Sequence, residues 1–263
     1  MNQMERLLIT FFISLSPNLH FDYVLGCILE GTIMRTIMVL NSKGGSGKTT
    51  LVTNLAGYYA SQGKTTIIKD YDPQGSSSEW IKQRCYSLPQ IHGLSAFKSC
   101  SPHVTRAWQM RLPANADRLI IDTPAGINLQ SYVSTIKSVD KILIPLSPSS
   151  IDVRATAMFV HNLQEFMGLY SSEADIAIVA NRVNVNSSAY QAMVTTFRNL
   201  SLSFVTTLST NEHYLQAAER GVSLLEIDHP SVAQDKLEWA PLLNWIEEDV
   251  VMQTKQESHL YAV

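Results

Sequence analysis

Apolar residues occur in short consecutive runs along residues 34–225, and longer segments of mixed polarity separate these runs. Runs of Val, Ile and Leu without polar alternation are typical of strands buried on both faces of a parallel sheet. We expect strands at residues 37–40, 65–68, 119–121, 142–146, 176–180 and, with a weaker pattern, 204–208. We expect helices at residues 49–62, 76–84, 129–138, 152–167, 188–199 and 212–220. Gly63, Gly168 and Gly221 follow three of these helices and are expected to cap them in the left-handed conformation.

The repeated strand–helix units predict an α/β fold with three layers, in which a mostly parallel, twisted sheet lies between helices on both faces. The first expected strand begins just after Met34. We therefore expect residues 1–33 to be a dispensable N-terminal extension, residues 34–250 to form one domain and residues 251–263 to be a C-terminal tail. The apolar run at residues 7–15 is about half as long as the ~20 residues that a membrane-spanning helix needs.

Composition and charge narrow the class of protein. The chain has 263 residues, of which 45% are hydrophobic, so it can bury a full core and is not a disordered protein. The net charge of −3 is uneven: −2 in residues 1–33, +6 in residues 34–200 and −7 in residues 201–263. Any surface that binds a polyanion is therefore expected in the middle segment. The three cysteines, Cys27, Cys85 and Cys100, have no C-x-x-C spacing and are expected to be reduced thiols in the cytoplasm.

A glycine-rich loop follows the first expected strand and opens the first expected helix, which is the context of a phosphate-binding loop. Glycines allow the backbone N–H groups to turn inward around phosphate oxygens, and the helix N-terminus adds a positive dipole end. Lys48 is expected to reach the β- and γ-phosphates, and the Thr49 hydroxyl is expected to bind Mg²⁺ directly. The nucleotide-binding candidates in the loop are Gly44, Gly45, Ser46, Gly47, Lys48, Thr49 and Thr50.

Three carboxylates follow the next two apolar runs. Asp70 and Asp72 come at the end of the second expected strand, two residues apart, so they lie on the same side of the strand. One of them can orient an attacking water and also contact a water bound to Mg²⁺, although a turn-forming Asp-Pro would have the same sequence. Asp122 closes the third expected strand and is expected to hold Mg²⁺ through water.

The sequence K-G-G-x-G-K-T-T, which begins at Lys43, resembles the deviant Walker A loop of the ParA/MinD family of P-loop ATPases. This resemblance implies a P-loop NTPase fold and slow hydrolysis of ATP with Mg²⁺ in a homodimer, where Lys43 acts on the nucleotide of the partner subunit. The alternative for Lys43 is a solvated surface lysine. The segment after the second strand is similar to the D-x-D-P-Q element of the family. By that match Asp72 positions the attacking water and also holds Mg²⁺ through a second water. The resemblance makes Asp72, Lys43 and Lys48 the catalytic residues.

Later segments extend the resemblance to about residue 225. Thr123, Pro124 and Gly126 are similar to the switch segment that senses the γ-phosphate, although a plain turn would look the same. Asn181 ends a strand where family members place an asparagine that contacts adenine. An asparagine that only caps the strand is the alternative.

The family resemblance implies an ATP-dependent dimer that binds nonspecific DNA and is reset when a ParB-like protein or a cargo adaptor stimulates hydrolysis. The cargo would be a plasmid, a chromosome or a protein body such as the carboxysome, as in the McdA type, and the ATP-bound protein would associate with the nucleoid. The candidate DNA contacts are Arg154, Arg182, Arg198 and Arg220, for each of which a solvated or ion-paired surface arginine is the alternative.

Two other functions of the same superfamily remain as alternatives. A MinD-like membrane-associated ATPase needs a basic amphipathic helix near its C-terminus, whereas residues 239–251 are acidic here, so we expect no stable membrane association. A metal or iron–sulfur carrier needs paired cysteines near the dimer face, and Cys85 and Cys100 fall outside the switch segment.

Overall fold

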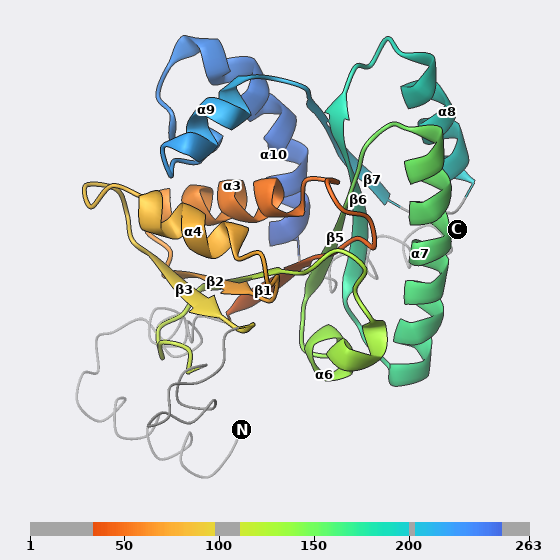
Figure 1. Cartoon of the computed structure of the whole chain (residues 1–263), viewed down its shortest axis with the longest axis horizontal. Helices are drawn as coiled ribbons and strands as arrows, with labels where there is room; N and C mark the ends of the chain where they lie inside the picture. The colour runs from red at the N-terminus through yellow and green to blue at the C-terminus, as the bar shows by residue number, and fades with distance from the viewer. Residues whose placement is uncertain (1–33, 98–110, 200–202, 249–263) are drawn as a thin grey trace, which may run out of the picture. The chain divides into compact units, whose positions relative to one another are not determined.

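The computed structural model describes residues 34–97, 111–199 and 203–248, and the sheet dominates this part of the chain (Figure 1). Seven strands form one sheet in the order β3-β2-β4-β1-β5-β6-β7. Every pair of neighbouring strands is parallel, which confirms the predicted α/β class. The strands are β1 Arg35–Val39, β2 Thr66–Asp70, β3 Ile91–Ser95, β4 Arg118–Asp122, β5 Lys141–Leu146, β6 Asp175–Val183 and β7 Ser203–Ser209.

Helices cover both faces of the sheet (Figure 1). One face carries α3 (Lys48–Ser61), α4 (Ser76–Gln83) and α10 (Ala233–Glu247), with α9 (His213–Glu219) beside α3 and α4. The other face carries α6 (Val133–Ile136), α7 (Ser150–Tyr170) and α8 (Ser188–Arg198). Three short 3-10 helices are η1 Leu129–Tyr132, η2 Leu224–Glu226 and η3 Pro230–Val232. The three-layer arrangement agrees with the sequence prediction.

Successive residues of the central strand explain why its sequence is continuously apolar. Ile37 and Val39 point into an apolar cluster that contains Leu55 of α3, whereas Met38 and Leu40 point into a second cluster with Phe166 of α7. All four residues, the last three of β1 and Leu40 directly after it, are fully buried. A strand covered by helices on both faces has no solvent-facing position, so no polar alternation arises.

One strand and one α-helix do not appear among the sequence predictions, and neither do the short helices η2 and η3. The edge strand β3 has the sequence IHGLS, in which His92 and Gly93 are exposed, so it has no continuous apolar run. The helix α10 contains Pro241 within its span. Its Trp239, Leu242 and Ile246 are nevertheless fully buried in the same apolar cluster as α3.

The helix ends confirm two of the three predicted glycine caps. Gly63 and Gly221 have φ values of 75° and 63°. The prediction for Gly168 is wrong, because α7 continues to Tyr170 and Ser171 takes the left-handed conformation with φ 52°. Tyr170 packs against Phe166 with their ring centroids 4.7 Å apart, and this contact stabilises the extra residues of the helix. The single helix expected at residues 129–138 is instead η1 followed by α6.

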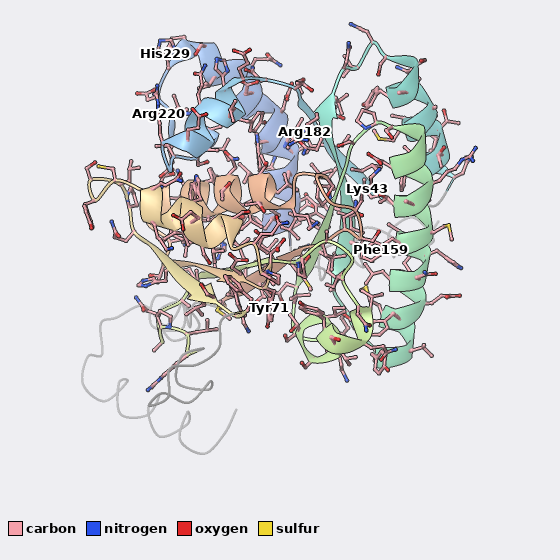
Figure 2. The ribbon with its side chains drawn as sticks, in the orientation of Figure 1. Lys43, Tyr71, Phe159, Arg182, Arg220 and His229 are labelled. Atoms are coloured by element: carbon pink, nitrogen blue, oxygen red, sulfur yellow. The ribbon has the colours of Figure 1, made fainter. Side chains whose placement is uncertain are left out.

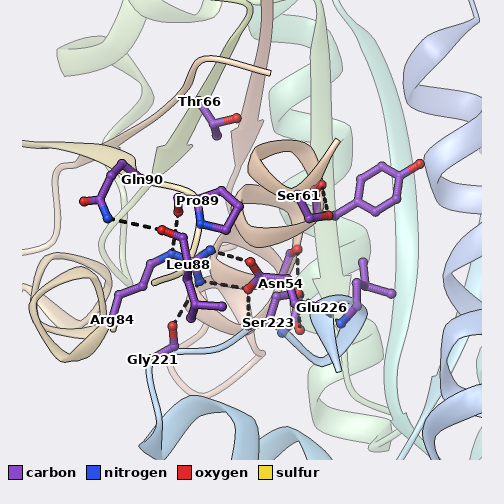
Figure 3. Close-up of polar contacts among 12 residues, drawn as sticks. Asn54, Ser61, Thr66, Arg84, Leu88, Pro89, Gln90, Gly221, Ser223 and Glu226 are labelled. Atoms are coloured by element: carbon purple, nitrogen blue, oxygen red, sulfur yellow. Dashed lines mark hydrogen bonds and ion pairs between the residues drawn. The ribbon is translucent and has the colours of Figure 1, made fainter. Parts of the chain in front are cut away.

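A buried polar network joins α3, α4 and the segment Gly221–Glu226 (Figure 3). The Arg84 guanidinium forms a two-point ion pair with the Glu226 carboxylate, and Arg84 Nη1 also donates to the Gly221 carbonyl oxygen at 3.1 Å. Ser223 Oγ donates to the Asn54 carbonyl oxygen at 2.9 Å, and Asn54 Oδ1 accepts from the Leu224 N–H at 2.7 Å. The C-terminal third of the chain is thus fixed to the helix that follows the glycine-rich loop.

The carboxyl ends of β1, β2 and β4 meet at one edge of the sheet because the strands are parallel. In the strand register, Asp122 is paired with Val39 on one side and with Asp70 on the other. The chain first winds from β1 toward β3, and after β4 it winds from β5 toward β7. The loop after β1 therefore lies at the point where the winding direction reverses, which is where open α/β sheets place their ligand sites.

No helix in residues 34–97, 111–199 or 203–248 is long and apolar enough to cross a membrane. The predicted N-terminal extension and C-terminal tail lie outside the described residues, as do Cys27 and Cys100, and the proposed domain boundaries stay predictions. Cys85 is exposed.

Candidate functional site

The loop between β1 and α3 depends on glycine at two positions. Gly45 and Gly47 have φ values of 74° and 97°, which side chains disfavour. Gly47 is also the N-cap residue of α3, and a Cβ atom placed on it would lie 1.9 Å from Nδ2 of Asn181. Asn181 Nδ2 in turn donates to the carbonyl oxygen of Ser46 at 3.0 Å. Asn181, near the end of β6, therefore contacts the loop at the N-terminus of α3.

A cavity of about 570 Å³ lies against this loop. It falls within the size range of small-molecule sites. Some residues predicted to belong to the nucleotide site do not line this cavity; they include Ser46, Asp122, Thr123 and Gly126. The lining residues are Gly44, Gly45, Gly47, Lys48, Thr49, Thr50, Asp72, Pro73, Gln74, Ser76, Pro124, Ala125 and Arg182.

Lys48 is buried beneath the loop, with 7% of its surface exposed. Its Nζ donates to the carbonyl oxygens of Asn41 at 3.3 Å and Lys43 at 3.2 Å. Burial lowers the pKa of Lys48, and the charges of Asp122 and Asp72 act against this decrease. The ammonium group is thus held by backbone dipoles at the wall of the cavity, where phosphate oxygens are its natural partners.

The hydroxyl oxygen of Thr49 and the carboxylate oxygens of Asp122 are suitable ligands for a hard cation such as Mg²⁺. Thr49 Oγ1 donates to Asp122 Oδ2 at 3.0 Å. The other carboxylate oxygen, Oδ1, is buried and has no hydrogen-bond partner among the described residues. Burial, and secondarily the charge of Asp70, raises the pKa of Asp122 to about 7, whereas the hydroxyls of Thr49 and Ser77 and the charge of Lys48 act to lower it. A buried carboxylate oxygen without a partner beside a hydroxyl fits a Mg²⁺ site, because Mg²⁺ takes oxygen ligands and waters.

Asp70 and Asp72 have different surroundings. Asp70 is fully buried, its Oδ1 accepts from the Asp72 N–H at 3.0 Å, and its Oδ2 accepts from Ser78 N–H and Oγ–H at 3.0 and 2.8 Å. Asp72 is half-buried and lines the cavity, where its Oδ1 accepts from the Gln74 N–H at 2.9 Å. Asp70 therefore fixes the turn that presents Asp72 to the cavity.

The segment after β4 connects the strand to the loop. Thr123 Oγ1 donates to the carbonyl oxygen of Val39 at 2.9 Å, and the Gly126 N–H donates to the carbonyl oxygen of Ser42 at 2.8 Å. Gly126 has a φ of 67°. Pro124, between these two anchors, lines the cavity. The segment after β4 is therefore hydrogen-bonded both to β1 and to the glycine-rich loop, and the switch role of Thr123, Pro124 and Gly126 stays a prediction.

Lys43 lies outside the cavity lining and forms an ion pair with Asp152 in the first turn of α7. Its side chain is 40% exposed, and the ion pair distinguishes it from a freely solvated lysine. The sequence prediction missed this partner. Asp152 belongs to the segment I-D-V-R-A, which resembles a stretch of the ParA/MinD family, but nothing in the local sequence indicates that its side chain meets Lys43.

Asn181 lines a second cavity of about 270 Å³ next to the first. It is 4% exposed, and its Nδ2 donates one hydrogen bond to Ser46; a side-chain amide has a second N–H donor and an acceptor oxygen besides. Sequence reasoning did not select the residues that complete this cavity on β7 and α9, because they come from separate segments. The other lining residues are Thr50, Arg182, Ser209, Thr210, Asn211, Tyr214, Leu215 and Ala218.

The four arginines predicted as candidate DNA contacts do not form one cluster. Arg154 and Arg198 are exposed on α7 and at the end of α8. Arg220 follows α9, far from Arg182 and Lys43 in the molecule (Figure 2). Arg182 instead lies at the glycine-rich loop, where its Nη1 donates to the carbonyl oxygen of Gly45 at 3.3 Å.

Comparison with known proteins extends these observations. The family model of the CobQ/CobB/MinD/ParA nucleotide binding domain matches residues 37–224. The Maintenance of carboxysome distribution protein A of Halothiobacillus neapolitanus is 27% identical over 198 residues, covering 73% of this chain and 87% of that protein. A solved structure of a Cyanothece McdA variant in complex with ATP has a TM-score of 0.61 and 19% identity, covering 84% of this chain and 100% of that chain. The MinD cell division protein of Aquifex aeolicus has a TM-score of 0.60 and 17% identity, covering 82% and 98% of the two chains.

Proposed function

The chain belongs to the CobQ/CobB/MinD/ParA nucleotide-binding family, and from this premise we propose that it is a ParA-type ATPase that positions a cargo in the cell. It binds ATP with Mg²⁺, forms a homodimer and hydrolyses ATP slowly. The observation that carries this proposal is that Lys48, Thr49 and Asp72 line one cavity and that Thr49 also contacts Asp122 behind it.

Each of these residues has a defined task in the hydrolysis of ATP. The loop N–H groups and Lys48 would bind the phosphates, and Thr49 and Asp122 would hold Mg²⁺, Thr49 directly and Asp122 through water. When bound, Mg²⁺ would neutralise charge on the phosphate oxygens. Asp72 would orient the attacking water and also contact a water of the metal, and Asp70 fixes the orientation of Asp72.

Lys43 makes hydrolysis conditional on the dimer. In the single chain its ammonium group is paired with Asp152. To reach the nucleotide of a partner subunit it must leave Asp152, and it then stabilises the negative charge that develops on the leaving group. Exchanging one anionic partner for another keeps the cost of this movement low.

The dimer binds nonspecific DNA and is released when an adaptor protein stimulates hydrolysis, so the protein is cytoplasmic and associates with the nucleoid in its ATP state. Similarity to proteins named for carboxysome distribution, in Halothiobacillus neapolitanus and in Gloeobacter kilaueensis, supports a protein body as the cargo. The middle segment of the chain has a net charge of +6, which supports an interaction with a polyanion.

The test is binding of the full chain to nonspecific duplex DNA in the ATP, ADP and nucleotide-free states at two salt concentrations. We expect the ATP state to bind at least about tenfold more tightly than the ADP state, and we expect this affinity to fall as salt is raised. Equal binding in the ATP and ADP states, or ATP-dependent binding to anionic lipid vesicles in place of DNA, would contradict the proposal.

Two variants separate the steps of the cycle. Lys48→Ala should lose nucleotide affinity and with it the ATP-dependent binding to DNA. Asp72→Ala should bind ATP and dimerise but not hydrolyse, because it lacks only the group that orients water. Equilibrium binding of a fluorescent ATP analogue and phosphate release measure these two properties. Loss of ATP binding in Asp72→Ala would be inconsistent with its role in water positioning.

A further inference from the structure

Arg182 has an unusual backbone conformation at the edge of the site. Within the described residues, only Ser171 and Arg182 are non-glycine residues with positive φ, and the value for Arg182 is 56°. Ser171 ends a helix, where this conformation is common, but Arg182 lies within β6. The pairing of β6 with β7 shifts between Asn181 and Val183, so Arg182 is the extra residue of a bulge. Bulges re-aim a side chain, and strained residues gather at functional sites.

The bulge places Arg182 at the junction of the two cavities. Thr50 and Arg182 are the two residues that line both the cavity of about 570 Å³ at the glycine-rich loop and the cavity of about 270 Å³ beside Asn181. Arg182 Nη1 donates to the Gly45 carbonyl oxygen at 3.3 Å, which holds the guanidinium over the loop. A guanidinium has five N–H donors, so most of them remain for a ligand.

The charge of Arg182 also matters for the larger cavity. The charged side chains that line it are Lys48, Asp72 and Arg182. The charges of Lys48 and Asp72 cancel formally, so Arg182 gives the lining its net positive charge. In the smaller cavity Arg182 is the charged residue of the lining. A polyphosphate that extends from one cavity to the other must pass this guanidinium.

We propose that Arg182 is a nucleotide-binding residue whose guanidinium contacts the phosphates nearest to the nucleoside, and that it is not a DNA contact. This inference rests on the proposed function, since it takes the ligand to be a nucleoside di- or triphosphate with its base in the cavity beside Asn181. The planar fork of arginine suits two phosphate oxygens. ADP and ATP share these phosphates, so Arg182 contributes equally to the binding of both.

The experiment measures dissociation constants of fluorescent ADP and ATP analogues for the full chain and three variants. Arg182→Gln should weaken both nucleotides by roughly the same factor, about tenfold for the loss of one charge-assisted contact. Arg182→Gly should weaken them similarly while the melting temperature stays the same or rises, because glycine adopts a φ of 56° without cost. Arg198→Gln is the matched control, since Arg198 is an exposed arginine outside both cavities, and it should bind nucleotides like the unchanged chain.

Three results would overturn the inference. The first is unchanged nucleotide binding in Arg182→Gln together with weaker ATP-dependent binding to DNA, which would make Arg182 a DNA contact. The second is a loss for ATP without a loss for ADP, which would place the guanidinium at the terminal phosphate. The third is an equal loss in Arg198→Gln, which would show a general effect of charge. If the unchanged chain binds neither nucleotide, the proposed function itself fails, and that outcome is distinct from the other three.

Discussion

At the scale of single residues, the burial of Asp122 makes its ionisation unfavourable in the folded protein. Its pKa is raised from an ordinary 3.8 to about 7, chiefly by burial. The folded chain therefore holds a proton that the unfolded chain releases between these two values. The stabilisation from this proton is fully present below about pH 4 and is lost as the pH rises through about 7.

We predict that Asp122→Asn removes this pH dependence. Relative to the variant, the unchanged chain should lose roughly 2–4 kcal/mol of unfolding free energy between pH 4 and pH 8 in the absence of nucleotide and Mg²⁺. Urea unfolding at several pH values measures the difference. Adding Mg²⁺ and ATP should restore the stability of the unchanged chain at pH 8, because the cation favours the charged carboxylate. A difference between the two proteins that is the same at every pH would contradict this assignment.

The two left-handed glycines Gly47 and Gly63 form a matched pair for a second prediction. Gly63→Ala should cost about 1 kcal/mol and leave nucleotide binding intact, since a Cβ atom there has no neighbour within 4 Å and only the backbone is strained. Gly47→Ala adds a clash with Asn181 to the same kind of strain. It should displace the loop and abolish nucleotide binding. Thermal unfolding and binding of a fluorescent ATP analogue measure the two effects, and equal behaviour of both variants would exclude Asn181 as the support of the loop.

At the scale of elements, the ion pair between Arg84 and Glu226 connects the end of α4 to η2 across a buried interface. Both side chains are less than 5% exposed. A buried pair contributes little net stability compared with apolar residues, but removing one partner leaves the other charge without compensation. The pair therefore specifies how the C-terminal third of the chain docks on α3 and α4 (Figure 3).

We predict that Glu226→Gln lowers the unfolding free energy by about 3–5 kcal/mol. The exposed pair between Lys82 and Glu79 supplies the control, since both side chains are 61% exposed. Lys82→Gln should change stability by less than about 0.5 kcal/mol. Chemical denaturation of the two variants beside the unchanged chain tests the contrast. A loss of under 1 kcal/mol in Glu226→Gln would mean that water reaches Arg84 in solution.

The sequence predicted the central strands and missed elements whose pattern depends on distant neighbours. β1 is covered on both faces, and this burial is visible as four consecutive apolar residues that begin in β1 and end just after it. Among the described strands β3 pairs with β2 alone, so two of its side-chain positions can face water and the apolar run is lost. Gly168 shows the reverse error, because a local cap signal is overridden by packing between Tyr170 and Phe166.

The same distinction applies to the site. The sequence could place the loop residues and the carboxylates at the ends of β2 and β4 at one edge of the sheet, because each of these segments consists of a few adjacent residues; their chemical roles stay predictions. The pairing of Lys43 with Asp152 joins segments more than 100 residues apart, as does the contact between Arg182 and Gly45. Such contacts arise from the order of strands β1, β5 and β6, which local patterns do not contain.

At the scale of the whole molecule, Lys43 gives a prediction about subunits. If Lys43 acts on the nucleotide of its partner, a mixed dimer of a Lys43→Ala chain and an Asp72→Ala chain has one complete site, because the Asp72→Ala chain supplies Lys43 to the site that keeps Asp72. If Lys43 acted in its own subunit, neither site would be complete. We expect the hydrolysis rate per mixed dimer to be about half that of the unchanged dimer. Coexpressed chains with different affinity tags allow the mixed dimer to be isolated, and loss of hydrolysis in it would contradict action across the interface.

The position of α10 has a consequence for the synthesis of the protein. Trp239, Leu242 and Ile246 close the apolar cluster around Leu55, and Tyr59 of α3 donates a hydrogen bond to Glu247 at 2.7 Å. The helix behind the glycine-rich loop is therefore left uncovered in a growing chain until α10 has emerged from the ribosome. Contacts between such distant segments form late, because the long connecting chain must first be closed. We expect a nascent chain that already contains the whole loop to be unable to bind nucleotide, so that the first ATP is taken up only after translation has passed Glu247.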